Sequence, residues 1–453
     1  MTRASASTGH AQKNWYNILA DIPFELPPDI PPPARSDKPH AVKLQLPMAL
    51  VRQSMTRERL VPIPAPVLEK YLSWRPTPMR RARALEQYLG TRARIYYKYE
   101  GGNASGSHKL CTATAQAHYY AAAGAERLVT GTGAGQWGTA LAVACHEFGL
   151  ACKVYMVAKS FHEKPYRQTV MRLYDAEVVP SPGPAAERAG HTSGRGEIHP
   201  GNIAYAVTEA FADALAHEGT QLSVGSGEAY SILHSTVIGL EAREQLEPAE
   251  QPDIVIGSLG AGSNFGGIAM PFIGRKLRGE SDVRCIAVEA QRCPKLTRGR
   301  YCYDYTDGSG VSPLQKMYTL GSRFTTAGGH AGGLRYHACS KIISALYHHR
   351  LVEAVAYPQS DVFASGVLFS RTEGILPAPE SAHAIHCAID MAKQADAQGT
   401  APVILFCLSG HGLFDLASYE AYLNGTMADM PLSDDDIRRS LAQLPQLDEE
   451  AVR

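Results

Sequence analysis

The sequence predicts an α/β fold with two lobes, each built on a parallel or mostly parallel sheet flanked by helices. Short apolar segments alternate with helical ones, this alternation starts again in the second half of the chain, and each half has a glycine-rich loop directly after a strand. Strands of parallel sheets are covered on both faces, so they are short and apolar throughout. A chain of 453 residues also has room for two or three domains.

The chain opens with a proline-rich segment. The stretch IPFELPPDIPPP at 22–33 contains six prolines and cannot be regular helix. We expect residues 1–74 to form an N-terminal arm laid on the surface. Residues 75–222 are expected to form the first lobe and 223–453 the second.

Apolar runs and their spacing place the remaining elements in order. Strands of the first lobe are predicted at 94–100, 127–130, 153–157 and 177–179. Strands of the second lobe are predicted at 253–258, 284–290, 352–357 and 403–409. Helical patterns lie between them, among them 136–146 and 165–176, and the polar, glycine-rich stretch 183–202 predicts a surface loop.

Charge and cysteine content exclude several classes of function. Lys+Arg and Asp+Glu both number 44, so neither nucleic acid nor an anionic membrane is expected as a partner. The 9 cysteines contain no CxxC pair, which argues against a disulfide framework and a zinc site. No signal-peptide core or membrane-length apolar run is present. We expect a reduced, cytoplasmic, soluble protein that acts on a small neutral or zwitterionic molecule.

Two glycine-rich loops are candidates for anion binding. GTGAGQWG at 131–138 and GSLGAGSNFGG at 257–267 each follow a strand and precede a helix, whose N-terminal N–H groups attract anions. The first loop also matches GxGxxG. A dinucleotide site needs an acidic residue at the end of the next strand, and here that strand ends in Ala-Lys-Ser. A tight turn or a phosphate or carboxylate site is therefore favoured over nicotinamide binding.

A lysine lies at the end of a third glycine-rich loop. EGGNASGSHKL at 100–110 places Lys109 where a helix begins, and the positive end of a helix dipole disfavours an ammonium there. A lysine with a lowered pKa is a good imine former and base. An ordinary solvated lysine near a helix start is the alternative interpretation.

These motifs together resemble the tryptophan synthase β subunit. EGGNASGSHKL, GTGAGQWGTAL, GSLGAGSNFGG, TEGILPAPESAHA and LSGHG occur in the order of that family. WYNIL and RPTP near the N-terminus match its longer, second type, and the resemblance runs from Trp15 to about Leu444. It implies a fold-type II pyridoxal-phosphate enzyme with the cofactor between the lobes. It also implies a mobile substrate-side subdomain in the first lobe, 75–222, and a phosphate-binding loop in the second, 223–453.

The resemblance assigns roles position by position. It implies that Lys109 forms the imine with pyridoxal phosphate and moves the α-proton, that Glu373 lies beside the cofactor ring, and that Ser409 binds the pyridine nitrogen. The cofactor phosphate would be held by His108 and by a cup formed from Gly260, Ala261, Gly262, Ser263 and Asn264. The substrate carboxylate would be received by Thr132, Gly133, Ala134, Gly135 and Gln136. The family has a third glycine where this chain has Ala261, which requires a negative φ at that residue.

The pattern departs from the family at the expected nucleophile pocket. Gly131 replaces a glutamate that assists indole in the family, and glycine can do neither acid nor base chemistry. Cys111 replaces an asparagine and Ser235 a glutamine. These changes are neutral, or they alter the second half of the reaction.

The predicted function is β-replacement on L-serine, or a related β-substituted amino acid, through an aminoacrylate, with an altered nucleophile. The alternatives are an ordinary tryptophan synthase β chain, a serine or threonine dehydratase, and a catalytically idle pyridoxal-phosphate-binding homologue. The resemblance also implies a homodimer and admits a monovalent cation, and it leaves partnership with an α subunit open.

Two further features lie near the C-terminus, a group of four histidines and Arg335. The histidines of this stretch have no spacing that favours a metal, so no metal site is predicted at His330, His337, His348 and His349. Arg335 contacts the substrate carboxylate or holds a loop, and the sequence leaves both readings open.

Overall fold

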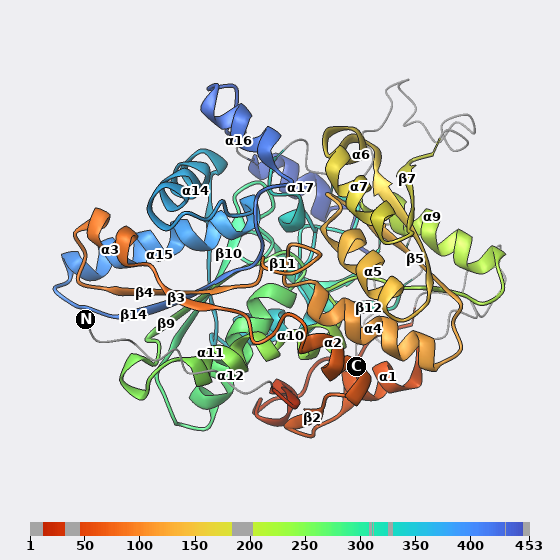
Figure 1. Ribbon diagram of the computed structural model, residues 1–453, viewed down its shortest axis with the longest axis horizontal. Coiled ribbons are helices and arrows are strands. Elements are labelled where there is room, and N and C mark those ends of the chain that lie inside the picture. Colours follow the sequence, from red (N-terminus) through yellow and green to blue (C-terminus); the bar gives the residue numbers. More distant parts are fainter. Residues whose placement is uncertain are drawn as a thin grey trace.

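The computed structural model describes residues 12–31, 46–183, 203–307, 310, 312–324, 329–430 and 432–446. The surface loop predicted at 183–202 therefore lies outside the described residues beyond its first position, as do parts of the predicted N-terminal arm. Two sheets organise the rest of the chain (Figure 1).

The larger sheet has six strands in the order β13-β10-β9-β14-β4-β3. All neighbours are parallel except the pair β3 and β4 at one edge. The strands are β3 (Met79–Arg81), β4 (Arg94–Tyr99), β9 (Ile254–Ser258), β10 (Arg284–Ala290), β13 (Glu353–Tyr357) and β14 (Val403–Leu408). Every residue of β9 and β14 is buried, as expected for central strands of a sheet covered on both faces.

Helices cover both faces of this sheet, and Figure 1 shows them as separate layers above and below it. One layer consists of α3 (Arg83–Leu89), α14 (Gln359–Glu373) and α15 (Pro379–Ala397). The other consists of α10 (Ala229–Ser235), α11 (Val237–Gln245) and α12 (Ser263–Leu277).

The smaller sheet has four parallel strands in the order β7-β6-β5-β8. The strands are β5 (Arg127–Thr132), β6 (Ala151–Val157), β7 (Glu177–Ser181) and β8 (Thr220–Leu222). One face is covered by α9 (Ile203–Ala216), and the other by α5 (Gln136–Glu147) with α4 (Leu110–Ala122) and α7 (Pro165–Leu173) behind it. The short helix α6 (Ala158–Glu163) leads from β6 to α7. The two-lobed α/β fold predicted from the sequence is confirmed.

The remaining elements lie around these lobes. A hairpin of β11 (Arg300–Tyr305) and β12 (Leu314–Thr319) is followed by η3 (Gly332–Leu334) and α13 (Lys341–His348). A short turn, η2 (Pro248–Glu250), precedes β9, and α16 (Leu416–Leu423) and α17 (Asp434–Leu441) end the described chain.

The strand pairing does not follow the lobe boundary expected at residue 75. Both β3 and β4 belong to the larger sheet, where β4 pairs with β14 along its whole length. The first lobe therefore begins after β4, since the chain passes from the larger sheet into α4 before it reaches β5. The division of the chain by residue number otherwise stays a prediction.

The N-terminal segment is more deeply buried than a surface arm would be. It forms β1 (Asn14–Tyr16), η1 (Ile18–Ala20), α1 (Met48–Met55), β2 (Leu60–Pro62) and α2 (Ala65–Tyr71). Trp15, Leu50 and Val67 are fully buried. Trp15 and Val67 belong to the core of the larger lobe, whereas Leu50 packs into the core of the smaller one.

A buried ion network joins this segment to the larger lobe. Arg75 contacts Glu100 at 2.9 Å and Glu241 at 2.8 Å, and Lys98 contacts Glu241 at 2.7 Å. All four side chains are buried, so loss of one partner would leave a charge without water or a counterion, at a cost of about 3–5 kcal/mol. The network fixes the start of the Gly101–Lys109 loop.

Candidate active site

The candidate site lies at the carboxyl ends of parallel strands from both sheets. Its lining comes from the loops that follow β4, β5, β9 and β14, together with η3 and the start of α15. Ligand sites of open α/β sheets lie at this edge.

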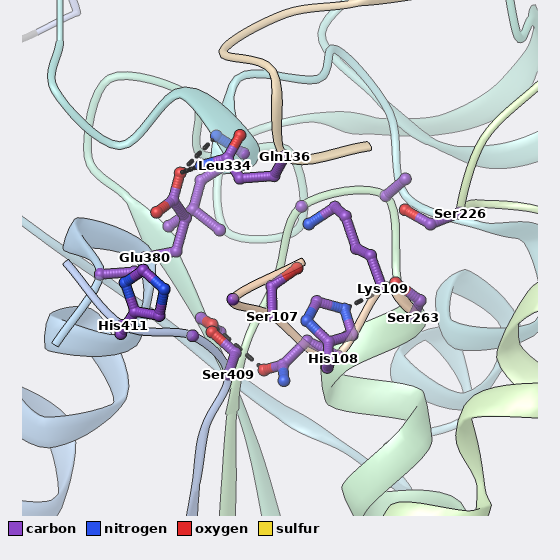
Figure 2. Close-up of a pocket in the computed structure, with 18 of the residues that line it drawn as sticks. Ser107, His108, Lys109, Gln136, Ser226, Ser263, Leu334, Glu380, Ser409 and His411 are labelled. Atoms are coloured by element: carbon purple, nitrogen blue, oxygen red, sulfur yellow. Dashed lines mark hydrogen bonds between the residues drawn. The ribbon is translucent and has the colours of Figure 1, made fainter. Parts of the chain in front are cut away.

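Lys109 lines this pocket as the N-cap of α4 (Figure 2). Desolvation by burial lowers the pKa of its amine from 10.5 to about 8. Glu380 opposes this shift and Arg167 adds to it, so both side chains lie within electrostatic range of the amine. A substantial fraction of Lys109 is therefore neutral near physiological pH and able to act as a nucleophile or base.

His108 turns to the other side of the same loop. Its Nε2 lies 3.0 Å from Ser263 Oγ, the contact drawn as a dashed line in Figure 2. Burial lowers its pKa well below the ordinary value, so the ring is neutral. Its Nδ1 is buried and has no hydrogen-bond partner among the described residues.

The second glycine loop forms a cradle at the N-terminus of α12. Gly260, Ala261, Gly262, Ser263 and Asn264 all line the pocket. Gly262 has a φ of +148°, and a Cβ there would lie 2.8 Å from the Ile343 side chain. Ala261 is not among the described non-glycine residues with positive φ. The negative φ that an alanine needs at this position of the loop is therefore confirmed. The cradle presents backbone N–H groups at a helix N-terminus, the arrangement that binds phosphate.

Ser409 follows β14 and lines the opposite side of the pocket. Its hydroxyl lies 2.8 Å from the Ser381 hydroxyl, which also accepts the backbone N–H of Gly410 at 3.1 Å. Ser381 thus fixes the position of Ser409 from the start of α15.

The first glycine loop reaches the pocket mainly through Gln136, the first residue of α5. Of the expected carboxylate-binding stretch Thr132–Gln136, it alone is in the lining. Gly135 has a φ of +95°, and a Cβ there would lie 2.8 Å from Arg167 Cδ. The loop therefore packs directly under the Arg167 stem.

The expectation for Glu373 is wrong. Glu373 ends α14, outside the pocket lining, where its Oε1 accepts the backbone N–H of Leu85 at 2.9 Å. Glu380, in the first turn of α15, lines the pocket instead. Its Oε1 accepts Gln136 Nε2 at 2.7 Å and the Gly333 N–H at 2.6 Å, while its buried Oε2 has no partner among the described residues (Figure 2). The two glutamates belong to one motif, and only the fold shows which of them faces Lys109.

Gly131, Cys111 and Ser235, the residues of the expected nucleophile pocket, are not among those that line this pocket. Cys111 lies under the Arg75 guanidinium, whose Nη1 is 3.2 Å from its sulfur. Ser235 donates to Ser231 O within α10 at 2.8 Å. The three residues are buried and contact different neighbours. The resemblance showed that these positions differ from the family, but not whether they lie together in the fold.

Gly131 is covered by the backbone of α9. A Cβ at this position would lie 2.5 Å from Val207 N and 2.6 Å from Ala206 C. Distances below 3.0 Å to backbone atoms cannot be relieved by rotating a side chain. Glycine is therefore required here as long as α9 rests on β5.

The structure adds residues that the sequence reading missed. Arg167 of α7 lines the pocket, and its guanidinium contacts Asp415, which precedes α16. Ser107 and His411 also line it. The sequence showed α7 only as an amphipathic helix, and no signal distinguished Arg167 from its neighbours.

The four C-terminal histidines have separate structural contacts. His337 Nε2 lies 2.9 Å from Tyr305 O, His348 stacks on Tyr301, and His349 stacks on Phe24. His330 packs edge-on against Phe363. In the described part of the chain no group of three or more His, Cys, Asp or Glu residues is placed to hold a metal.

The donor set fits a cofactor that carries an aldehyde, a phosphate and a ring nitrogen. A lysine with a lowered pKa, a phosphate cradle and a hydroxyl surround one pocket. Four buried polar atoms of the pocket have no protein partner among the described residues, namely Ser107 Oγ, His108 Nδ1, Arg167 Nε and Glu380 Oε2. Buried polar groups without partners are rare, so this clustering indicates a ligand site.

Comparison with known proteins gives a consistent result. The family model described as "Pyridoxal-phosphate dependent enzyme" matches residues 71–410. The tryptophan synthase beta chain 2 of Methanosarcina mazei is 49% identical over 417 residues, which cover 92% of this chain and 94% of that protein. The protein of the same name from Pyrococcus abyssi is 48% identical over 93% of this chain and 96% of its own length. That of Aquifex aeolicus is 46% identical over 95% and 100%.

Solved structures share the fold at low identity. An L-serine ammonia-lyase from Rhizomucor miehei superposes with a TM-score of 0.58 at 16% identity, covering 78% of this chain and 98% of that one. Threonine deaminase isoform 2 from Solanum lycopersicum superposes with a TM-score of 0.59, also at 16% identity, covering 88% and 98%. No helix in the described residues has the length and apolar character needed to cross a membrane.

Proposed function

The chain belongs to the pyridoxal-phosphate-dependent enzymes that include the tryptophan synthase β chains, and from that premise we propose that it exchanges the β-substituent of L-serine or a related amino acid for a nucleophile other than indole. Its cofactor is pyridoxal phosphate, and it is a lyase of the tryptophan synthase β-like type. The observation that carries the choice of nucleophile is the lining of the pocket, in which Leu334 is the one large apolar side chain among the described residues. The absence of a carboxylate at position 131, where a Cβ would meet the backbone of α9, supports it.

The cofactor-binding roles follow the donor set of the pocket. We assign the phosphate to the Gly260–Asn264 cradle, which presents N–H groups at the start of α12 and lies beside the neutral ring of His108. Ser409 is assigned to the pyridine nitrogen, and its contact with Ser381 supports a fixed hydroxyl there. When bound, pyridoxal phosphate withdraws electrons from the substrate, which makes the α-proton acidic and lets the β-substituent leave.

Lys109 is assigned to cofactor attachment and to movement of the α-proton. The lowered pKa of its amine supports both tasks, because only the neutral amine can form an imine or accept a proton. Glu380 takes the place that the sequence gave to Glu373. Its free Oε2 is a hydrogen-bond acceptor within the pocket, and Gln136 and Gly333 hold its other oxygen.

The substrate carboxylate is assigned to the loop Thr132–Gln136. The loop lies at the N-terminus of α5, where N–H groups without helical partners favour an anion.

The lining of the pocket argues against indole as the second substrate. Of the described residues that line it, only Leu334 has a large apolar side chain. A flat aromatic nucleophile that reacts through carbon needs apolar walls and a group that accepts a hydrogen bond from its ring N–H. A positioned acid or base contributes about 10²–10⁴-fold to rate, and none can stand at position 131.

The test is incubation of the holoenzyme with L-serine and a panel of thiol, amine and carbon nucleophiles that includes indole. Products are identified by mass spectrometry, and pyruvate is measured in a coupled assay. We expect consumption of L-serine with pyruvate or a non-indole adduct as the main product. Tryptophan as the main product from indole, with little pyruvate, would restore the reading as an ordinary synthase. No consumption of L-serine would refute the assigned substrate.

A further inference from the structure

Two basic side chains share one buried carboxylate where the lobes meet beside the pocket. Lys164 and Arg167, at the start of α7 in the smaller lobe, both contact Asp415, which follows β14 of the larger lobe. The Arg167 Nη2–Asp415 Oδ2 distance is 3.0 Å, and these two side chains are 3% and 0% exposed. The Lys164 side chain is 10% exposed. The group carries two positive charges and one negative charge, so it keeps one excess positive charge beside the pocket.

Arg167 also has a donor that nothing in the described protein satisfies. Its Nε is buried without a hydrogen-bond partner, although Nη2 is bound to Asp415. A buried N–H without a partner costs about 1–3 kcal/mol, and more for a charged group. Arg167 lines the pocket, and its charge acts on the Lys109 amine, so a ligand in that pocket can supply an acceptor for this donor.

The arginine stem lies on the loop that precedes α5. A Cβ on Gly135 would lie 2.8 Å from Arg167 Cδ and 3.4 Å from its Cβ, so the two residues are in direct contact. The unsatisfied guanidinium and the N–H groups at the start of α5 are thus adjacent. Each of them favours an anion, and together they indicate one anion subsite.

We propose that Arg167 binds the α-carboxylate of the amino acid substrate together with the backbone of the Gly133–Gln136 loop. The identity of the ligand as an amino acid rests on the proposed function. The bound carboxylate neutralises the excess positive charge of the Lys164–Arg167–Asp415 group and accepts the free N–H. Arg335 lies near Gly332, where its Nη2 would be 3.1 Å from an added Cβ, and it does not line the pocket.

The experiment compares an amino acid with its amide in the holoenzyme. L-alanine and L-alaninamide are titrated into the wild type and Arg167→Gln, and binding is followed by the absorbance of the bound cofactor. We expect the dissociation constant for L-alanine to rise roughly 30-fold in the variant, equivalent to about 2 kcal/mol. For L-alaninamide, which carries no negative charge, we expect a change of less than about threefold.

Two further variants keep the experiment decisive. Arg172→Gln removes a guanidinium from the exposed side of the same helix and should leave both dissociation constants unchanged. Arg167→Lys keeps the charge and the stem but loses the planar donor pair. It should raise the dissociation constant for L-alanine several-fold and leave that for L-alaninamide unchanged. If Arg167→Gln does not fold, the comparison is made with Arg167→Lys.

Three results would overturn the proposal. They are unchanged L-alanine binding in Arg167→Gln, equal weakening of acid and amide, and a selective loss for L-alanine in Arg335→Gln instead. L-alanine has no β-substituent, so the result does not depend on whether L-serine undergoes elimination. Arg167-dependent binding of L-alanine in an enzyme that does not consume L-serine would refute the proposed function alone.

Discussion

The charge on Lys109 depends on a small number of neighbours. Burial disfavours the ammonium, Glu380 favours it, and Arg167 disfavours it, with a resulting pKa of about 8. Below this pKa the amine is protonated and unreactive, and above it the amine is a nucleophile. The reactivity of one residue therefore reports on the electrostatics of the whole pocket.

This leads to a pH prediction for cofactor uptake. In protein freed of cofactor, the rate at which Lys109 forms an imine with added pyridoxal phosphate should rise with pH to a midpoint near 8, well below the ordinary lysine value of 10.5. Glu380→Gln should move the midpoint downward, because it removes a charge that favours the ammonium. Arg167→Gln should move it upward. Imine absorbance after rapid mixing measures the rate, and a midpoint near 10 in the wild type would show that burial does not lower the pKa.

The two glutamates of the TEGILPAPE motif provide a matched pair of variants. Glu380→Gln should lower kcat for consumption of L-serine by about 10²-fold or more, because Glu380 is the carboxylate in the pocket. Glu373→Gln should leave kcat within about twofold, because that side chain only accepts the Leu85 N–H outside the pocket. Steady-state kinetics of both variants decide the assignment, and the reverse pattern would reinstate Glu373.

Glu373 shows that the sequence alone does not predict which single side chains enter the site. The motif carries glutamates at 373 and 380, and resemblance alone does not show which one faces the cofactor. The available signal was Pro379 at the first position of a helix with a glutamate directly after it, which marks Glu380 as a first-turn residue. Arg167 and Asp415 gave no signal, because their contact joins positions 248 residues apart. Lys109 and the cradle were predictable because each is a short continuous motif.

At the scale of elements, α9 explains why position 131 is glycine. Ala206, Ala210 and Ala214 recur every four residues on the buried side of α9, and such small side chains let its backbone approach β5 closely. Asp213 then fixes the helix, because it accepts hydrogen bonds from Arg127 at 2.7 Å and Tyr155 at 2.6 Å. The apolar strands were predictable from their pattern, whereas this close contact depends on where α9 packs.

Gly131→Ala tests this contact directly. The added Cβ would lie 2.5 Å from Val207 N, so α9 must shift, and overpacking of this kind costs about 1–3 kcal/mol. The variant should melt at a lower temperature than wild-type holoenzyme by circular dichroism. Gly133→Ala is the control, because a Cβ added there would have its nearest described contact at 3.9 Å, to Gly332 O, and the φ of Gly133 is not positive. Gly131→Glu should be destabilised at least as much, so it is not expected to restore indole use.

At the scale of the whole molecule, the lobes are joined beside the pocket by the contacts of Asp415 with Lys164 and Arg167. The two cations hold the pKa of Asp415 below its ordinary value, so this carboxylate stays charged in neutral solution. The stability that it contributes is present above the ordinary carboxyl pKa and is lost as pH falls through the lowered one.

Substitution of Asp415 tests how much its contacts with Lys164 and Arg167 stabilise the protein. Asp415→Asn keeps the shape of the side chain but leaves the buried Arg167 and the largely buried Lys164 without this counterion, which should destabilise the holoenzyme by about 3–5 kcal/mol. Adding Lys164→Gln removes one of those cations, so the double variant should be more stable than Asp415→Asn alone, as a double-mutant cycle by urea denaturation would measure. Asp435→Asn is the control, because its contact with Arg438 is exposed and should contribute little. If the double variant were instead less stable by the sum of the two single effects, Lys164 and Asp415 would not be coupled. The contact between the lobes would then be stabilised mainly by the packing of Arg167 on Phe414.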